Sequence, residues 1–250
     1  MEKLTKVINF SGGRTSALMT ILNYEKGDIV LFQDTGREHP ATYEFIRRFE
    51  TEENIPITWI KWGALDLPFD SYLKHRNYST IPNMQKRTCT TELKIRTAKR
   101  YLKNKGILKF KNLIGFRYDE QDRILKRKQE FKKVVDIFPL NEPMYTKEYV
   151  NEYWKNKKYT LEIPPILGNC TCCFMKGQSA ILAILREFPE LAEPWIKDEK
   201  EFKKRHGVKK GGTYFKGITF EQLRNLAQNN LFKDIDLNEI KPAFNCSCTG

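Results

Sequence analysis

The chain has 250 residues and a mass of 29.5 kDa, which is enough to bury a full hydrophobic core. This length favours one α/β domain with an appended segment over two equal domains. Lys and Arg number 44 against 31 Asp and Glu, and the formal net charge of +13 favours polyanionic partners such as nucleic acid or free nucleotides. No apolar run is long enough to span a bilayer, and the first residues are strand-like rather than signal-like, so we expect a cytoplasmic protein without a membrane segment.

The start of the chain predicts a strand at Lys6–Phe10, a glycine turn and a helix at Ala17–Leu22. Glycines and hydroxyl side chains at a helix N-terminus gather backbone N–H groups and the positive end of the helix dipole around one small volume, which suits a phosphate. The spacing matches neither a Walker A loop nor the GxGxxG of dinucleotide folds. An ordinary glycine-rich turn is the structural alternative. The candidate nucleotide-binding loop, called the 11–16 loop below, consists of Ser11, Gly12, Gly13, Arg14, Thr15 and Ser16.

Short β-branched runs alternate with longer amphipathic segments, a pattern typical of βαβ units. We therefore predict an α/β fold with an open, doubly wound, mostly parallel sheet. Residues 1–140 are interpreted as a nucleotide-binding α/β domain and residues 141–250 as a helical, cysteine-rich C-terminal segment. The expected strands are 6–10, 28–32, 57–60, 108–115 and 134–138, and the expected helices are 17–22, 40–50, 69–75, 90–105, 147–157, 180–188, 194–205 and 220–227.

Polar or glycine-rich residues follow three of the expected strands. Because ligands bind at the carboxyl ends of an open parallel sheet, we expect these residues to meet at one site. Asp34 and Thr35 are expected near an adenosine, while Gly115 lets the backbone approach an α-phosphate that Arg117 neutralises. The structural alternatives are an Asx-type turn at Asp34 and a tight turn at Gly115.

Within the 11–16 loop, the backbone of Gly12 and Gly13 is expected to hold a terminal phosphate or pyrophosphate together with the hydroxyls of Ser11 and Ser16. Arg14 adds a bidentate charged contact.

A reactive cysteine is predicted at the start of the 90–105 helix. Thr88 or Thr90 can cap this helix, which explains the threonines by capping alone. Cys89 lies at the helix N-terminus between Arg87 and Lys94, and this environment lowers the pKa of a thiol. Such a thiol suits a nucleophile or a metal ligand.

The six cysteines are clumped in a chain without an export signal, which favours metal or redox chemistry over disulfides. A CxxC pair fits zinc, a redox pair or half of an iron–sulfur site. Because the chain has only three histidines, either a Cys₄ zinc site or a [4Fe–4S] cluster fits. Cys172, inside the CxxC, is expected to point away. The expected ligands are Cys89, Cys170, Cys173 and one of Cys246 or Cys248.

These motifs resemble those of the phosphoadenylylsulfate (PAPS) reductase-like branch of the PP-loop superfamily, which is also described as adenine nucleotide alpha-hydrolase-like. The resemblance runs from the SGGRTS loop through residues 32–36, 87–89 and 115–120 to the cysteine-rich tail. It implies a PP-loop (HUP-like) fold, an adenine nucleotide, either ATP or PAPS, with Mg²⁺, and an iron–sulfur cluster rather than zinc. It also implies catalytic roles for Arg14, Cys89, Lys94 and Arg117.

The chain differs from the assimilatory reductases in two respects. The terminal Glu-Cys-Gly-Leu-His type of motif is absent, and the cysteine order differs from that of the cluster-bearing sulfonucleotide reductases. We therefore expect an enzyme that adenylylates a substrate with ATP, releases pyrophosphate and transfers sulfur from a donor that the sequence leaves open. The alternative is a PAPS or adenylylsulfate reductase, an oxidoreductase that releases sulfite.

Basic stretches at 96–105, 123–128 and 197–210 are compatible with solvated helix faces or with a nucleic-acid surface. They make nucleic acid the expected acceptor, and they leave a zinc-containing nucleic-acid-binding module as a second alternative. The oligomeric state is left open.

Overall fold

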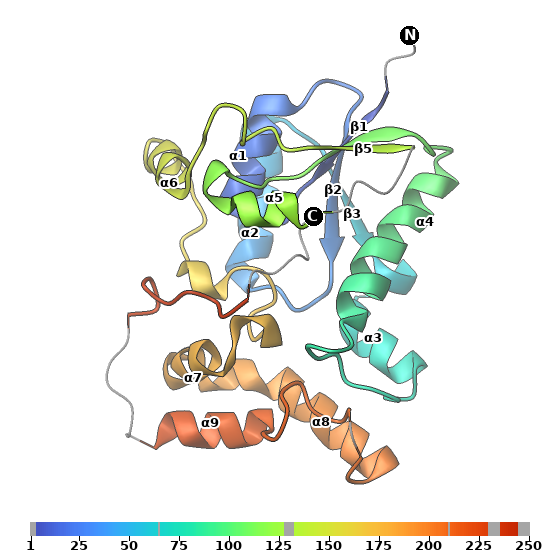
Figure 1. Cartoon of the computed structure of the whole chain (residues 1–250), viewed down its shortest axis with the longest axis vertical. Coiled ribbons are helices and arrows are strands. Elements are labelled where there is room, and N and C mark those ends of the chain that lie inside the picture. Colours follow the sequence, from blue (N-terminus) through green and yellow to red (C-terminus); the bar gives the residue numbers. More distant parts are fainter. Residues whose placement is uncertain (1–3, 65, 128–132, 210, 230–235, 245–250) are drawn as a thin grey trace.

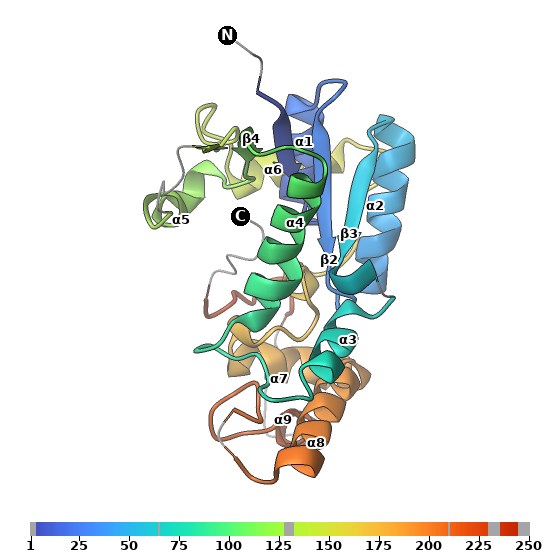
Figure 2. The same ribbon diagram turned by 90° about the vertical axis from the view of Figure 1, so that its right-hand side faces the viewer.

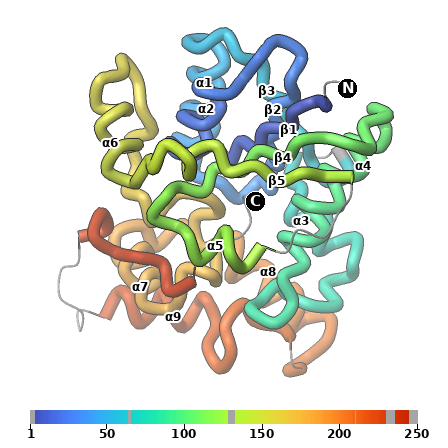
Figure 3. The backbone as a smooth tube through the Cα atoms, turned by 45° about the horizontal axis from the view of Figure 1, so that its top comes forward, coloured from blue at the N-terminus to red at the C-terminus, as the bar shows by residue number. Residues whose placement is uncertain are grey.

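The computed structural model describes residues 4–64, 66–127, 133–209, 211–229 and 236–244. Within these ranges five strands form one parallel sheet in the order β3-β2-β1-β4-β5, and Figure 3 shows the strands side by side. Val7 of β1 lies opposite Ile29 of β2 and Asn112 of β4. The strands are β1 (Lys6–Asn9), β2 (Ile29–Asp34), β3 (Ile57–Lys61), β4 (Phe110–Leu113) and β5 (Val134–Ile137).

Helices cover both faces of the sheet. On one face lie α1 (Arg14–Asn23), α2 (Pro40–Glu53) and α6 (Lys147–Lys155), whose apolar side chains share one core with the sheet. On the other face, α4 (Thr97–Asn104) packs Leu102 against Val7 and Leu31, and Figure 2 shows α4 and α2 on opposite sides of the strands. This is the doubly wound arrangement predicted from the sequence.

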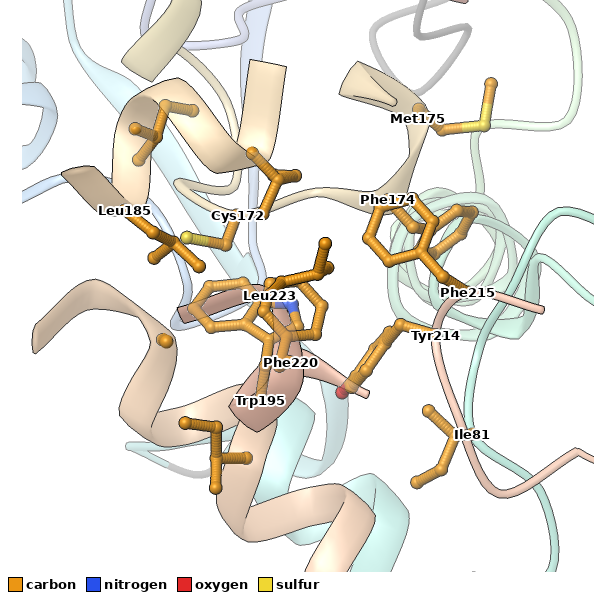
Figure 4. Packing of buried hydrophobic residues seen from close by; sticks show 14 of the residues in the cluster. Ile81, Cys172, Phe174, Met175, Leu185, Trp195, Tyr214, Phe215, Phe220 and Leu223 are labelled. Atoms are coloured by element: carbon orange, nitrogen blue, oxygen red, sulfur yellow. The ribbon is translucent and has the colours of Figure 1, made fainter. Parts of the chain in front are cut away.

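Four further helices form a second core at the carboxyl ends of the strands, below the sheet in Figure 1. It includes the aromatic side chains of Trp195, Tyr214 and Phe220, drawn in Figure 4. The helices that build it are α3 (Pro68–His75), α7 (Gln178–Glu187), α8 (Glu193–His206) and α9 (Phe220–Gln228).

Most predicted elements are confirmed, and the differences lie at their ends. Helix α1 begins at Arg14, so the second half of the 11–16 loop is already helical. The expected helix 90–105 starts as a π-helical segment at Cys89–Arg96 and continues as α4. A short helix, α5 (Gln121–Leu125), was not expected.

The proposed boundary near residue 140 remains an interpretation. Helix α6 lies beyond it in sequence, yet Val150 and Trp154 of α6 are buried in the core of the α/β sheet. No described helix is both long enough and apolar enough to cross a membrane.

Candidate functional site

The 11–16 loop lines a cavity of about 250 Å³ at the carboxyl ends of β1 and β4. The chain order reverses here, because β1 pairs with β2 on one side and with β4 on the other. Such switch points are where open parallel sheets bind ligands. The expected site residues that line this cavity are Ser11, Gly12, Gly13, Arg14, Thr15, Ser16, Gly115 and Arg117.

Hydrogen bonds inside the loop hold its shape. The Oγ of Ser16 accepts from the backbone N–H of Ser11 at 3.0 Å and donates to the carbonyl of Gly13 at 3.0 Å. Gly13 is the N-cap residue of α1, and no side chain caps this helix. The first-turn N–H groups of α1 therefore have no side-chain acceptor, which suits a bound anion. Trp154 fixes the loop from α6 by donating Nε1–H to the carbonyl of Arg14 at 2.9 Å.

Gly12 meets two requirements that only glycine satisfies. Its φ is +80°, in the left-handed region, and a Cβ placed there would lie 2.7 Å from Cγ2 of Thr42. Gly13 differs, because a Cβ would meet only Oγ of Ser11 at 3.7 Å. The backbone of Gly12 is thus packed directly against α2.

Of the three arginines that line the cavity, Arg14 and Arg117 are in different electrostatic states. Arg14 forms no ion pair with a described residue, and burial lowers the pKa of its guanidinium. Arg117 instead binds Asp119 at 2.9 Å and Glu120 at 3.4 Å, and its Nη1 lies 3.4 Å from Oγ1 of Thr15. An uncompensated guanidinium at an uncapped helix N-terminus is an arrangement that attracts a phosphate.

Asp34 and Thr35 do not line this cavity. Asp34 accepts hydrogen bonds from the Tyr43 hydroxyl and the Gly36 N–H, both at 2.8 Å, so it forms the Asx-type turn considered as its alternative. It lines a separate depression of about 460 Å³ beside β3. Thr35 is buried, and its Oγ1 lies 3.4 Å from Sγ of Cys170.

Cys170 lies at the carboxyl end of β2, next to the cavity lined by the 11–16 loop. Its Sγ is 3.7 Å from Oε1 of Glu38, and its backbone forms an isolated bridge with Glu38. The backbone N–H of Thr171 donates to the carbonyl of Arg37 at 3.0 Å. Gly168 and Asn169, which precede Cys170, line the cavity. Residues 170–173, called the cysteine loop below, therefore connect the end of β2 with the candidate phosphate site.

Buried charges surround Cys170. Nζ of Lys94 lies 3.9 Å from Oε1 of Glu38, and Nζ of Lys176 donates to the carbonyls of Cys170 and Thr171 at 2.9 and 2.7 Å. Burial raises the pKa of Glu38, lowers that of Lys176 and raises that of the Cys170 thiol. The second oxygen of Glu38, Oε2, has no hydrogen-bond partner among the described residues.

The metal ligands expected from the sequence remain a prediction. Cys89 affects the pKa of Cys170, and Cys170, Cys172 and Cys173 all affect that of Lys176, so the four thiols share one electrostatic neighbourhood. Two lysines beside them suit an anionic thiolate site. Within residues 4–244, apart from the gaps given above, no three His, Cys, Asp or Glu side chains are arranged to hold a metal.

Cys246 and Cys248 lie outside the described residues. The described chain ends against the segment that follows Cys173, since the N–H of Ala243 donates to the carbonyl of Lys176 at 2.9 Å and that of Phe244 donates to Met175 at 3.1 Å.

Cys172 is more deeply buried than the other three described cysteines. It is fully buried in the C-terminal core near Leu185, as Figure 4 shows, and burial raises the pKa of its thiol to about 12.

Several residues of the site were not predicted from the sequence. Thr42 and Lys147 line the cavity, and Glu38 and Lys176 flank Cys170. Lys176 directly follows the apolar residues Phe174 and Met175, and a charged residue at such a place was the sequence feature that could have indicated a buried lysine.

The chain matches the family model described as the phosphoadenosine phosphosulfate reductase domain over residues 5–164. The chain belongs to this family. The match covers the whole parallel sheet and α6, and it ends before the 170–173 cysteine loop. Adenine nucleotides such as PAPS or ATP are substrates in this family.

Two curated proteins are similar to most of this chain. The chain is 31% identical over 207 residues to an uncharacterized nin region protein, ORF290, of Escherichia phage lambda, covering 71% of this chain and 68% of the phage protein. It is 27% identical over 208 residues to an uncharacterized protein of Methanocaldococcus jannaschii, covering 78% of this chain and 47% of the archaeal one. The match thus spans about half the length of the archaeal relative. A crystal structure of PAPS reductase from Candida auris, in a phosphate complex, gives a TM-score of 0.44 at 18% identity, covering 62% of this chain and 72% of that one.

Proposed function

We propose that this protein is a PP-loop enzyme that binds ATP at the 11–16 loop, transfers the adenylyl group to an acceptor and then replaces the adenylate with sulfur. One juxtaposition carries the proposal: the uncapped N-terminus of α1, where Arg14 has no ion pair with a described residue, shares a cavity with the residues that lead into Cys170. A phosphate-binding loop and a buried thiol therefore lie at one end of the same sheet.

The first step is adenylyl transfer. An acceptor carbonyl oxygen attacks the α-phosphorus of ATP, the bond to the bridging oxygen of the β-phosphate breaks, and pyrophosphate leaves with Mg²⁺. Arg14 and the first-turn N–H groups of α1 stabilise the leaving pyrophosphate, and Arg117 neutralises charge on the α-phosphate. To do so, Arg117 must exchange part of its pairing with Asp119 for the nucleotide.

The second step is sulfur transfer. A hydrosulfide donor forms a bond to the acceptor carbon, and AMP leaves with the former carbonyl oxygen, so that carbonyl, ATP and hydrogen sulfide give thiocarbonyl, AMP and pyrophosphate, with two protons released. Cys89, Cys170 and Cys173, with Cys246 or Cys248, would hold a [4Fe–4S] cluster. If only Cys89, Cys170 and Cys173 held the cluster, one iron would keep an open position that could bind the hydrosulfide.

Nucleic acid is the proposed acceptor, because the formal charge of +13 attracts polyanions. A carbonyl of a base provides the oxygen that the adenylyl step requires.

A product assay tests the nucleotide chemistry. Purified protein is incubated separately with ATP and with PAPS, each with a thiol reductant and total nucleic acid. Pyrophosphate and AMP from ATP support the proposal, whereas sulfite from PAPS without ATP consumption identifies a reductase instead. Arg14→Gln is expected to weaken nucleotide binding by about 10- to 100-fold, in line with the loss of one charged hydrogen bond. Arg76→Gln, at an exposed position on the end of α3, is the matched control.

Metal analysis tests the sulfur site. Iron, acid-labile sulfide and zinc are measured on protein purified without oxygen, together with Cys89→Ala and Cys170→Ala. Iron and sulfide that disappear in both variants support the cluster. Zinc without sulfide, unchanged in Cys89→Ala, contradicts it and favours a nucleic-acid-binding module with structural zinc.

The second candidate is a PAPS or adenylylsulfate reductase. It is favoured by the match of residues 5–164 to the family model that carries this activity in its description. In that reaction a thiolate attacks sulfur and no ATP is consumed, so the same product assay decides between the two.

A further inference from the structure

We propose that the outer face of the helix that begins at Cys89 is a docking surface for the phosphate backbone of a nucleic-acid duplex. This inference rests on the proposed function, because it places the acceptor. It starts from an asymmetry in the sequence: no Asp or Glu occurs between Glu92 and Asp119. Over the same residues the cations are Lys94, Arg96, Lys99, Arg100, Lys103, Lys105, Lys109, Lys111 and Arg117.

The cations that lie on the helix are divided between an inner and an outer face. Leu102 packs into the core on the sheet, and Lys94 points inward to Glu38. Arg96, Lys99, Arg100 and Lys103 follow the i, i+3, i+4, i+7 spacing of one helix face, and all four are exposed. Figure 2 shows α4 on the outside of the molecule, opposite α2.

Several of the cations on this helix lack an acidic partner among the residues that the structure describes. Arg96 pairs with Glu92 at 2.6 Å, whereas Arg100, Lys103 and Lys105 form no ion pair with any described residue. Like charges four residues apart destabilise a helix by about 0.2–0.5 kcal/mol per pair. The stripe therefore costs folding stability, which an external polyanion would offset.

The other long basic helix is less suitable. In α8, Lys200 pairs with Glu221 at 2.7 Å and Arg205 pairs with Glu201 at 3.2 Å. Part of the charge of α8 is thus compensated within the protein, although Lys203 and Lys204 in its last turn are exposed. In contrast, α4 contains no acidic residue, which makes it the stronger candidate for a polyanion.

The geometry of the stripe favours a duplex over a single strand. From Arg96 to Lys103 the helix rises about 10 Å, and a duplex carries one phosphate charge per roughly 1.7 Å of its axis, so the stripe faces several phosphates at once. The exposed residues of α4 are Lys99, Arg100, Lys103 and Asn104, and none of them offers an aromatic ring on which an unpaired base could stack. Binding should therefore depend on charge and vary little with sequence.

Duplex binding by the full chain tests this surface without requiring turnover. The probe is a fluorescein-labelled DNA duplex of about 20 base pairs, followed by fluorescence anisotropy between about 50 and 300 mM NaCl. The test variant is Arg100→Gln/Lys103→Gln/Lys105→Gln. The matched control is Lys26→Gln/Lys158→Gln/Lys216→Gln, which removes three exposed lysines elsewhere and lowers the charge equally.

The α4 variant is expected to bind at least tenfold more weakly at about 100 mM salt, and the slope of log K against log salt is expected to fall by about 2–3. The control should stay within about twofold of the wild type. Equal losses in both variants, or no binding by the wild type at about 50 mM salt, would overturn the proposal. A single strand of the same length that binds at least tenfold more tightly than the duplex would overturn the choice of a duplex. Circular dichroism checks that both variants are folded.

The Arg14→Gln variant separates this inference from the proposed enzyme. It should bind nucleotide about 10- to 100-fold more weakly and keep duplex binding. Wild-type protein that binds the duplex but turns over neither ATP nor PAPS would overturn the enzyme proposal alone. Wild-type turnover with unchanged duplex binding in the α4 variant would overturn the docking surface alone.

Discussion

Arg37 and Asp198 form a buried ion pair, with 2.9 Å between Nη2 and Oδ2, that joins the loop after β2 to helix α8. The side chains are 3% and 0% exposed. Tyr214 donates its hydroxyl to the same Oδ2 at 2.6 Å. The guanidinium also lies over the rings of Phe69 and Trp195, 4.7 and 4.8 Å from their centroids. The Arg37 side chain thus connects the loop after β2 with the second core, which α3, α7, α8 and α9 build.

The pair also supports the cysteine loop, because the carbonyl of Arg37 accepts the N–H of Thr171. Burial alone would lower the pKa of the Arg37 guanidinium, but Asp198 and Asp70 more than offset this and raise it. Arg37 therefore stays charged inside the protein.

Replacing Arg37 by methionine is expected to destabilise the protein strongly. Arg37→Met leaves the Asp198 carboxylate buried without its cation, and such losses cost about 3–5 kcal/mol. The free energy of unfolding is measured by urea denaturation followed by circular dichroism. Lys197→Met is the control, because Lys197 lies 3.9 Å from Asp70 with a side chain 59% exposed, and exposed pairs contribute about 0–1 kcal/mol. Similar losses in the two variants would contradict the structural role of the buried pair.

Glu199 predicts a pH-dependent stability. Its oxygens accept the backbone N–H groups of Tyr214 and Phe220 at 3.1 and 2.8 Å, and burial raises the pKa of the carboxyl from 4.5 to about 7. Between these two values the folded state holds a proton that the unfolded state has lost. The free energy of unfolding therefore falls as the pH rises from 4.5 to about 7, by at most about 3 kcal/mol.

The variant Glu199→Gln isolates this effect, because it removes the titrating group. Urea denaturation is carried out at several pH values across this window. The wild type should lose more stability than Glu199→Gln as the pH rises. Parallel curves for the two proteins would show that another group causes the slope.

The fold followed from the sequence because local signals agreed with one another. Strands 28–32 and 57–60 were β-branched or apolar runs, and they became β2 and β3 with small shifts at their ends. Helix α5 was not predicted, since five residues give too little periodicity for a helix signal.

The candidate site was predictable only where its chemistry is local. The glycines of the 11–16 loop indicated a phosphate site by themselves. Glu38 gave no such signal, because its environment depends on Cys170, 132 residues further along the chain. Arg37 likewise owes its burial to α8, so its sequence neighbours resemble an exposed loop.

The two glycines of the 11–16 loop should respond differently to alanine. Gly12→Ala forces a Cβ against Thr42 at a φ of +80°, and the left-handed conformation alone costs about 1–2 kcal/mol. Gly13→Ala is the control, because its φ is −98° and the added Cβ meets only Oγ of Ser11 at 3.7 Å. Thermal unfolding monitored by circular dichroism should show a lower Tm for Gly12→Ala alone. A comparable decrease in both variants would mean that the tight contact with α2 is not the cause.

The adjacent cysteines Cys172 and Cys173 should separate packing from metal binding. Cys172 is fully buried among apolar side chains, whereas Cys170 and Cys173 are partly exposed, so Cys172 is expected to serve packing rather than metal binding. Cys172→Ala is expected to keep the metal content of the wild type and to lose about 1 kcal/mol of stability from weaker core packing. Cys173→Ala is the matched variant, since it lies in the CxxC beside Lys176 and is expected to lose the metal. Iron and zinc analysis together with urea denaturation provides both readouts, and loss of metal from Cys172→Ala with retention in Cys173→Ala would reverse the assignment of the two thiols.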